Sequence, residues 1–108
     1  MLPTVLQITT TPGTPKQIST TQSQCSALWV VNLSSEIVAF GNKDLNRSSG
    51  AGVIALVPAL EAGATPDHNI IKVTALGSQE NLCDLRDYWL DTASGGTAAV
   101  VNIIPFVL

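Results

Sequence analysis

Short runs of apolar and β-branched residues recur along the chain, separated by turns rich in glycine, proline, serine and asparagine at intervals of roughly ten residues. These runs are too short for amphipathic helices, whereas regularly spaced short strands are typical of antiparallel sandwiches and barrels. The sequence therefore predicts an all-β protein, folded as an antiparallel β-sandwich or a jelly-roll-like barrel of about seven or eight short strands.

The clearest strand covers residues 26–33, where β-branched and aromatic residues accumulate. Alternation places four of its side chains on one face: Ala27, Trp29, Val31 and Leu33. Residues 37–40 follow after a short serine turn and end at Gly41 and Asn42, which tolerate positive φ. We expect the two segments to pair as a β-hairpin.

Four later segments also have the composition of strands: residues 53–57, 69–76, 88–91 and 97–104. In the last of them, alternation turns Val101 and Ile103 toward one face and Val100 and Asn102 toward the other. Residues 81–88 are the one candidate for a helix, of a single turn. Strands thus account for most of the expected structure.

The first quarter of the chain is dominated by threonine and serine and contains Pro12 and Pro15, which deny it a place in a central strand. We expect residues 1–14 to form an extended arm that either pairs at a sheet edge or reaches a neighbouring subunit. Residues 15–108 then make a single β-sandwich domain, and residues 104–108 are its C-terminal tail.

The composition is apolar for a domain of this length, with 45% hydrophobic and only 12% charged residues. Part of the surface is therefore expected to be covered by a partner. The net charge is −3 and the five cations are scattered, which argues against a nucleic-acid partner. No export signal or membrane-spanning segment is apparent, so we expect no membrane partner.

Residues 91–95 (Asp-Thr-Ala-Ser-Gly) resemble the catalytic turn of aspartic proteases. Those enzymes need glycine where this chain has Ala93, so that two carboxylates can share one proton. His68, the single histidine, lies beside Asp67 in a loop, and we interpret it as exposed to solvent. We expect no enzymatic activity, no cofactor and no metal ion.

Other polar residues have simpler interpretations. Cys25 and Cys83 are expected to be reduced, buried thiols, with a disulfide as the alternative. Asn32 and Asn46 begin Asn-x-Ser sequons, which we interpret as ordinary turn residues. One charged group lies near the C-terminus and is explained by surface ion pairing: Asp84, Arg86, Asp87 and Asp91.

Three features follow one another along the chain: residues 13–19 (Gly-Thr-Pro-Lys-Gln-Ile-Ser) before Cys25, residues 38–41 (Val-Ala-Phe-Gly), and residues 84–96, which end in Ser-Gly-Gly. Their order resembles that in a group of small structural proteins of tailed phages. In that group a Gly-Thr-x-x-x-Ile-Ser opening leads to a cysteine, as residues 13–19 lead to Cys25 here. A strand pair ending in Val-x-Val-Gly follows, as at residues 38–41 (Val-Ala-Phe-Gly). A late Asp-Leu-x-x-Ile-Tyr-Val-Asp strand then runs into a Ser-Gly turn, as in residues 84–96.

This resemblance implies a non-enzymatic β-sandwich protein of a virion, most specifically a capsid decoration or cement protein on the outer capsid surface, assembled in the host cytoplasm. Its expected partners are the major capsid protein and further copies of the chain, as a homotrimer. The alternative is a tail or fibre component that binds a receptor or glycan through Trp29, Trp89 or the loop of residues 44–52. The interface residues expected are Leu2, Val5, Leu6, Ile8, Trp29, Trp89, Ile104, Phe106 and Leu108.

Overall fold

The computed structural model describes residues 5–74, 77 and 81–107. The strands within these residues are β1 (Leu6–Thr9), β2 (Lys16–Gln17), β3 (Gln24–Cys25), β4 (Ala27–Asn32), β5 (Val38–Gly41), β6 (Val53–Val57), β7 (Ile70–Val73), β8 (Cys83–Asp84), β9 (Trp89–Asp91) and β10 (Val100–Phe106). A single 3-10 turn, η1 (Leu85–Asp87), lies within the segment expected to be helical. In the described part of the chain, no helix is long and apolar enough to cross a membrane.

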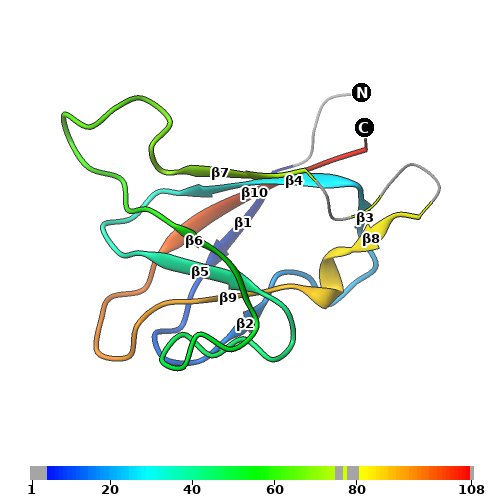
Figure 1. Cartoon of the computed structure of the whole chain (residues 1–108), viewed down its shortest axis with the longest axis horizontal. Coiled ribbons are helices and arrows are strands. Elements are labelled where there is room, and N and C mark those ends of the chain that lie inside the picture. Colours follow the sequence, from blue (N-terminus) through cyan, green and yellow to red (C-terminus); the bar gives the residue numbers. More distant parts are fainter. Residues whose placement is uncertain (1–4, 75–76, 78–80, 108) are drawn as a thin grey trace.

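Two four-stranded antiparallel sheets form the two layers of the molecule (Figure 1). The first sheet has the order β1-β10-β4-β7 and the second has the order β2-β9-β5-β6, while β3 and β8 form a small separate pair. The expected all-β antiparallel sandwich is therefore confirmed. Ten strands are present in the described residues, more than the seven or eight expected, because β2, β3 and β8 are pairs of residues too short to detect from composition.

The core lies between the two sheets and takes its side chains from the inner face of each. Leu28 and Val30 of β4 and Val101 and Ile103 of β10 are fully buried, as alternation predicted for β10. From the second sheet, three further strands contribute the fully buried side chains Val38, Phe40, Val57 and Leu90. Side chains on the outer face of each sheet do not contribute to this core.

The hairpin expected between residues 26–33 and 37–40 is wrong. β4 pairs with β10 and β7 in the first sheet, whereas β5 pairs with β6 and β9 in the second. The chain therefore crosses from one layer to the other between Asn32 and Val38. A local sequence pattern indicates that two strands follow each other but not whether they share a sheet, because that depends on partners distant in the chain.

Asn32 holds this crossing together from a fully buried position. Its side-chain amide donates to the carbonyl oxygens of Glu36 (2.6 Å), Pro58 (3.2 Å) and Val57 (3.3 Å). Its side-chain oxygen accepts from the backbone N–H (3.0 Å) and hydroxyl (2.8 Å) of Ser34. The interpretation of Asn32 as an ordinary turn residue therefore missed its role in joining the two layers.

Of the two alternatives expected for the N-terminal arm, residues 6–9 show pairing at a sheet edge, and residues 1–4 lie outside the described residues. β1 pairs with β10 along its whole length, from Leu6 opposite Ile103 to Thr9 opposite Val100. Residues 104–106 of the expected C-terminal tail belong instead to β10, which continues to Phe106 and pairs with β4. Both segments keep their hydrogen bonds within the sheet, where their alternating side chains can bury one face.

The two cysteines are directly opposite each other across the β3–β8 pair, and both are reduced, without a disulfide between them. Both cysteines were expected to be buried. Cys25 is buried, as expected, whereas Cys83 is only half-buried. Burial, with smaller contributions from Cys83 and Asp84, raises the pKa of the Cys25 thiol to about 11. Cys25 therefore stays protonated at neutral pH and packs as a small apolar residue.

Candidate functional site

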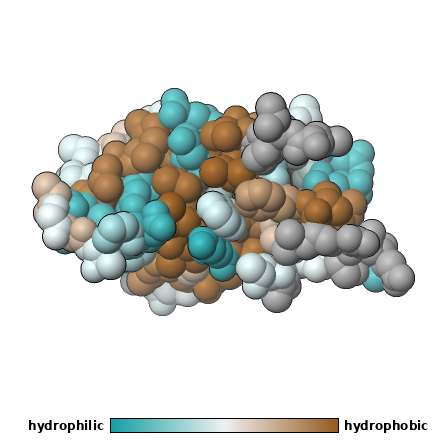
Figure 2. All heavy atoms as spheres, turned by 90° about the horizontal axis from the view of Figure 1, so that it is seen from above, coloured by the Kyte–Doolittle hydropathy of each residue, from teal (hydrophilic) through white to brown (hydrophobic). Residues whose placement is uncertain are grey.

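The outer face of the first sheet carries apolar side chains interspersed with polar ones, whereas a solvated face usually carries mainly polar residues. The register places Trp29 opposite Ile104 and Val31 opposite Asn102 on this face. We call the apolar side chains of this face the outer apolar face, and its described members are Trp29, Val31, Ile70, Val100, Ile104 and Phe106. All of them are half-buried. Figure 2 shows apolar residues spread over this side of the molecule with hydrophilic ones between them.

An aromatic pair and a cation lie next to one another on the outer face of the first sheet. The ring centroids of Trp29 and Phe106 are 5.4 Å apart, with an angle of 57° between the ring planes. The Lys72 ammonium lies 4.5 Å from the centroid of the Trp29 ring. Tilted aromatic pairs and cation–π contacts fix ring orientation, so Trp29 presents a defined surface to whatever covers it.

The structure brings together three of the predicted interface residues, Trp29, Ile104 and Phe106, on the outer apolar face. Val5 is 52% exposed just before β1. Leu6 and Ile8 instead pack against or within the core, so their side chains do not form part of the exposed surface. The reason is register, because Leu6 and Ile8 lie opposite the inward-facing Ile103 and Val101.

The remaining predicted interface residues lie elsewhere. Trp89 is half-buried in β9 of the second sheet, opposite Gly41 and Gln17, and so does not share a surface with Trp29. Leu2 and Leu108 lie outside the described residues. A second group of exposed apolar residues, which sequence reasoning did not single out, includes Ile54 (46% exposed) and Leu56 (50% exposed) on the edge strand β6.

A small polar cavity lies between the loop that joins β5 to β6, the end of β9 and the segment before β2, which Figure 1 shows near one another at the bottom of the view. The loop between β5 and β6 makes one wall by folding over the outer face of β5 and β9. Gly41 allows this approach, because a Cβ at Gly41 would collide with the carbonyl oxygen of Gly52 and with the side chain of Leu45. Gly41 was expected to supply a positive φ, and its role is instead to leave room for the loop.

Local hydrogen bonds fix the shape of this loop. Asn46 accepts from the backbone N–H groups of Ser48 (3.0 Å) and Ser49 (3.1 Å) through its side-chain oxygen. Its backbone N–H donates to the carbonyl oxygen of Ala51 (2.8 Å), and its carbonyl oxygen accepts from Gly50 (2.9 Å). The turn interpretation of Asn46 is therefore confirmed, and this turn places Arg47 at the cavity.

Asp91 forms the opposite wall of the cavity at the end of β9. Its side chain is 3% exposed, and burial raises the pKa of its carboxyl above the ordinary range. The backbone amides of Thr92 and Arg47 and the charge of Arg47 lower this pKa but do not offset the burial. Asp91 is the one acidic residue among the described residues that line the cavity. A single chain therefore does not supply, at this cavity, the two carboxylates that aspartic proteases use.

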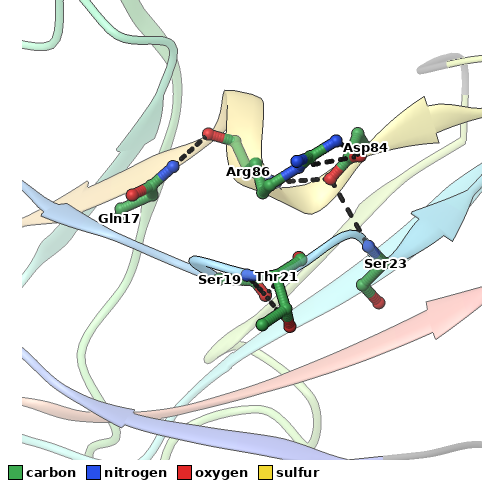
Figure 3. Close-up of polar contacts among 6 residues, drawn as sticks. All are labelled: Gln17, Ser19, Thr21, Ser23, Asp84 and Arg86. Carbon is green, nitrogen blue, oxygen red and sulfur yellow. Dashed lines mark hydrogen bonds and ion pairs between the residues drawn. The ribbon is translucent and has the colours of Figure 1, made fainter.

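Asp91 thus lies apart from the charged group in which the sequence placed it. Asp84 and Arg86 do form the expected surface ion pair, with 2.8 Å between Arg86 Nη2 and Asp84 Oδ2 (Figure 3). Asp84 Oδ1 also accepts from the backbone N–H of Arg86 and of Ser23, and Gln17 donates to the Arg86 carbonyl oxygen. This network begins η1 and connects it to the segment before β3.

His68 is half-buried and bonded, which corrects the expectation of a solvent-exposed ring. Its Nε2 accepts from the backbone N–H of Glu61 (2.9 Å), and its Nδ1 lies 2.8 Å from the carbonyl oxygen of Thr65. The ring therefore holds the loop between β6 and β7 in shape. No group of three or more metal-binding side chains occurs among the described residues, those around His68 included.

Replacing Asp91 with asparagine is expected to raise stability at pH 7. Because burial raises the pKa of Asp91 in the folded state, the folded state loses stability as the pH rises above about 3.9, the ordinary value in an unfolded chain. The neutral asparagine avoids that loss. The urea midpoint of Asp91→Asn should exceed that of the wild type at pH 7, and the difference should shrink at pH 3, where both side chains are neutral.

Asp84→Asn is the matched control and should show the opposite sign. Hydrogen bonds from the Arg86 side chain and backbone lower the pKa of Asp84, so its carboxylate stabilises the folded state above the ordinary pKa and loses this effect as the pH falls. Asp84→Asn should therefore lower the midpoint at pH 7. Equal midpoints for Asp91→Asn and wild type at pH 7 would contradict the assignment of a destabilising buried carboxylate.

Comparison of the chain with known protein families, with curated proteins and with solved structures gives no match.

Proposed function

We propose that the chain is a non-enzymatic structural protein of a phage virion, a capsid decoration or cement protein that acts through its surfaces. The observation that carries this proposal is the outer apolar face, where Trp29, Ile104 and Phe106 come together from two strands. The sequence resemblance to small virion proteins supports the same assignment. An apolar sheet face that no second layer of described residues covers is suited to a protein partner.

The physical demands on a cement protein agree with this surface. Such a protein must hold neighbouring shell subunits by burying apolar area, at roughly 25 cal/mol per Å² of apolar surface removed from water. Aromatic anchors near the centre of an interface carry most of the binding energy in protein complexes. Trp29 and Phe106 supply such anchors, and the partner proposed for this face is the major capsid protein.

A homotrimer requires a second surface, and the edge of the second sheet provides a candidate. β6 has one strand neighbour, β5, and carries Ile54 and Leu56 exposed on its outer side. Exposed apolar edge strands promote pairing with another chain. We propose that β6 makes the contacts between copies and that the outer apolar face makes the contact with the capsid, with the protein on the outer capsid surface.

Ile104→Lys is expected to abolish capsid binding without unfolding the protein. Ile104 is half-buried beside Trp29, so a lysine can extend into solvent in the free protein but would bury a charge in the complex. We expect capsid affinity to fall at least about 30-fold, as for the loss of a hot spot of about 2 kcal/mol. The measurement is co-sedimentation with capsids of the phage that encodes the protein, over a range of concentrations.

Leu60→Lys serves as the matched control, because Leu60 is 47% exposed in a loop outside both surfaces. It should bind capsids like the wild type. Undiminished co-sedimentation of Ile104→Lys would remove the outer apolar face from the proposal. Sedimentation equilibrium of Ile54→Lys tests the trimer separately, with a shift toward monomer expected.

A tail or fibre component that binds a receptor or glycan is the second candidate function. The polar cavity favours it, since residues 45–48 of the loop expected to bind glycan line that cavity. Trp29 and Trp89 lie on different sheets, so they do not form one stacking platform. The cavity is separate from the outer apolar face, and either function can therefore be tested while the other surface is intact.

A further inference from the structure

The polar cavity has walls from three loops that are distant in sequence. Its volume is about 200 Å³, and its lining consists of Gly13, Pro15, Leu45, Asn46, Arg47, Ser48, Asp91, Thr92 and Ser94. Backbone bonds join these loops, since Gly13 donates to the Thr92 carbonyl oxygen (2.9 Å). The hydroxyls of Thr10 and Thr92, 3.0 Å apart, add a buried bond beside it. The cavity is therefore built into the fold by contacts between its walls.

Two residues that line this cavity each have one buried side-chain atom with no hydrogen-bond partner among the described residues. These atoms are Nε of Arg47, a donor, and Oδ1 of Asp91, an acceptor. The described residues contain an ion pair between Arg86 and Asp84 but none between Arg47 and Asp91, although both line the cavity. A buried polar group without a partner costs about 1–3 kcal/mol, and more when it is charged. A bound molecule that satisfies both atoms would recover that cost.

The chemistry of the two atoms restricts the bound molecule. One wall carries a positive and the other a negative charge, so an anion would be repelled by Asp91 and a cation by Arg47. A hydroxyl group both donates and accepts, and adjacent hydroxyls can donate to Asp91 while accepting from Arg47. Ser48 and Ser94 extend this polar lining to exposed positions.

We propose that this cavity binds one sugar residue of a glycan through paired hydroxyl groups, with Asp91 as acceptor and Arg47 as donor. The volume is below that of pockets for drug-sized ligands, which is appropriate for one ring and not for an extended oligosaccharide. The site rests on the second candidate function and is independent of capsid docking. Loss of sugar binding and loss of capsid binding are therefore distinguishable outcomes.

The test is a titration of the ¹⁵N-labelled protein followed by amide chemical shifts. The probes are glucose, galactose, mannose and N-acetylglucosamine, each added separately, because single sugars commonly need millimolar concentrations to bind. The expected result is a saturable shift of amides in residues 45–48 and 91–94 with at least one sugar. Inorganic phosphate and glycine are tested in the same way as an anion and a zwitterion.

Variants assign the effect to the two atoms. Arg47→Lys keeps the charge but removes Nε–H, and Asp91→Asn removes the charged acceptor; each should weaken sugar binding at least about tenfold. Arg86→Lys is the matched control outside the cavity and should bind like the wild type. Since Asp91→Asn is expected to fold more stably, its loss of binding would not reflect unfolding.

Three results would overturn the proposal. The first is an absence of saturable shifts with all four sugars, which would leave ordered water as the partner of both atoms. The second is saturation with phosphate or glycine but with none of the sugars. The third is sugar binding that Arg47→Lys and Asp91→Asn leave unchanged, because the sugar would then bind elsewhere.

Discussion

Phe40→Ala is expected to lower the free energy of unfolding by about 3–5 kcal/mol, as for other aromatic truncations in cores. Phe40 is fully buried in β5, a strand with neighbours on both sides in the second sheet. Its ring stacks on Tyr88, with centroids 5.4 Å apart and 14° between the planes. Truncation would leave a cavity between the two sheets and remove this contact, and a domain of this size is stabilised by only about 5–15 kcal/mol in total.

Phe106→Ala is the control, because the chain contains one other phenylalanine and it lies on the outer apolar face. Its ring is only half-buried, so the loss should be less than half that of Phe40→Ala. Both values come from urea unfolding followed by circular dichroism. If the two variants lost equal free energy of unfolding, Phe40 would not contribute more to the packed core than the half-buried Phe106.

Asn32→Leu is expected to lower the free energy of unfolding by about 3 kcal/mol, although leucine has a similar size and is more apolar. The amide of Asn32 donates to three carbonyl oxygens, those of Glu36, Val57 and Pro58, and leucine offers no donor. The backbone groups left without partners lie where the chain passes between the layers. The loss should appear both in the urea midpoint and in faster amide hydrogen exchange of β5 and β6.

Asn102→Leu provides the comparison for Asn32→Leu. Asn102 lies on the outer face of β10, and its side-chain oxygen accepts one exposed bond from Gln7 (3.1 Å). The change in its unfolding free energy should stay within about 0.5 kcal/mol. If Asn32→Leu proved as mild as Asn102→Leu, the bonds of Asn32 would be dispensable and the crossing would be held by packing alone.

The strands were predictable because their signal is local. Alternation identified the inward residues Val101 and Ile103 of β10, and β-branched composition identified β4, β5 and β6. The pairing was not predictable, as the erroneous hairpin between residues 26–33 and 37–40 shows. β4 has its neighbours at residues 70–73 and 100–106, and no local pattern records such distant partners.

The candidate sites likewise include residues that the sequence indicated and residues that it did not. Trp29, Ile104 and Phe106 were expected as interface residues because composition predicted an apolar surface, and the structure places these half-buried side chains together on the outer face of the first sheet. The role of Arg47 was not predictable, because the loop places it beside Asp91 through the close approach of Gly41 and Gly52. A glycine at the end of a strand, such as Gly41, does not by itself indicate which segment of the chain packs against it.

The place of β10 in the first sheet has a consequence for synthesis of the chain. This last strand has β1 on one side and β4 on the other, so it is an interior strand made after both of its neighbours. Until residues 100–106 leave the ribosome, β1 has no partner in the sheet and β4 has one edge open. The first sheet can therefore close only after residues 100–106 have been translated, and contacts between segments far apart in the sequence are expected to slow its folding.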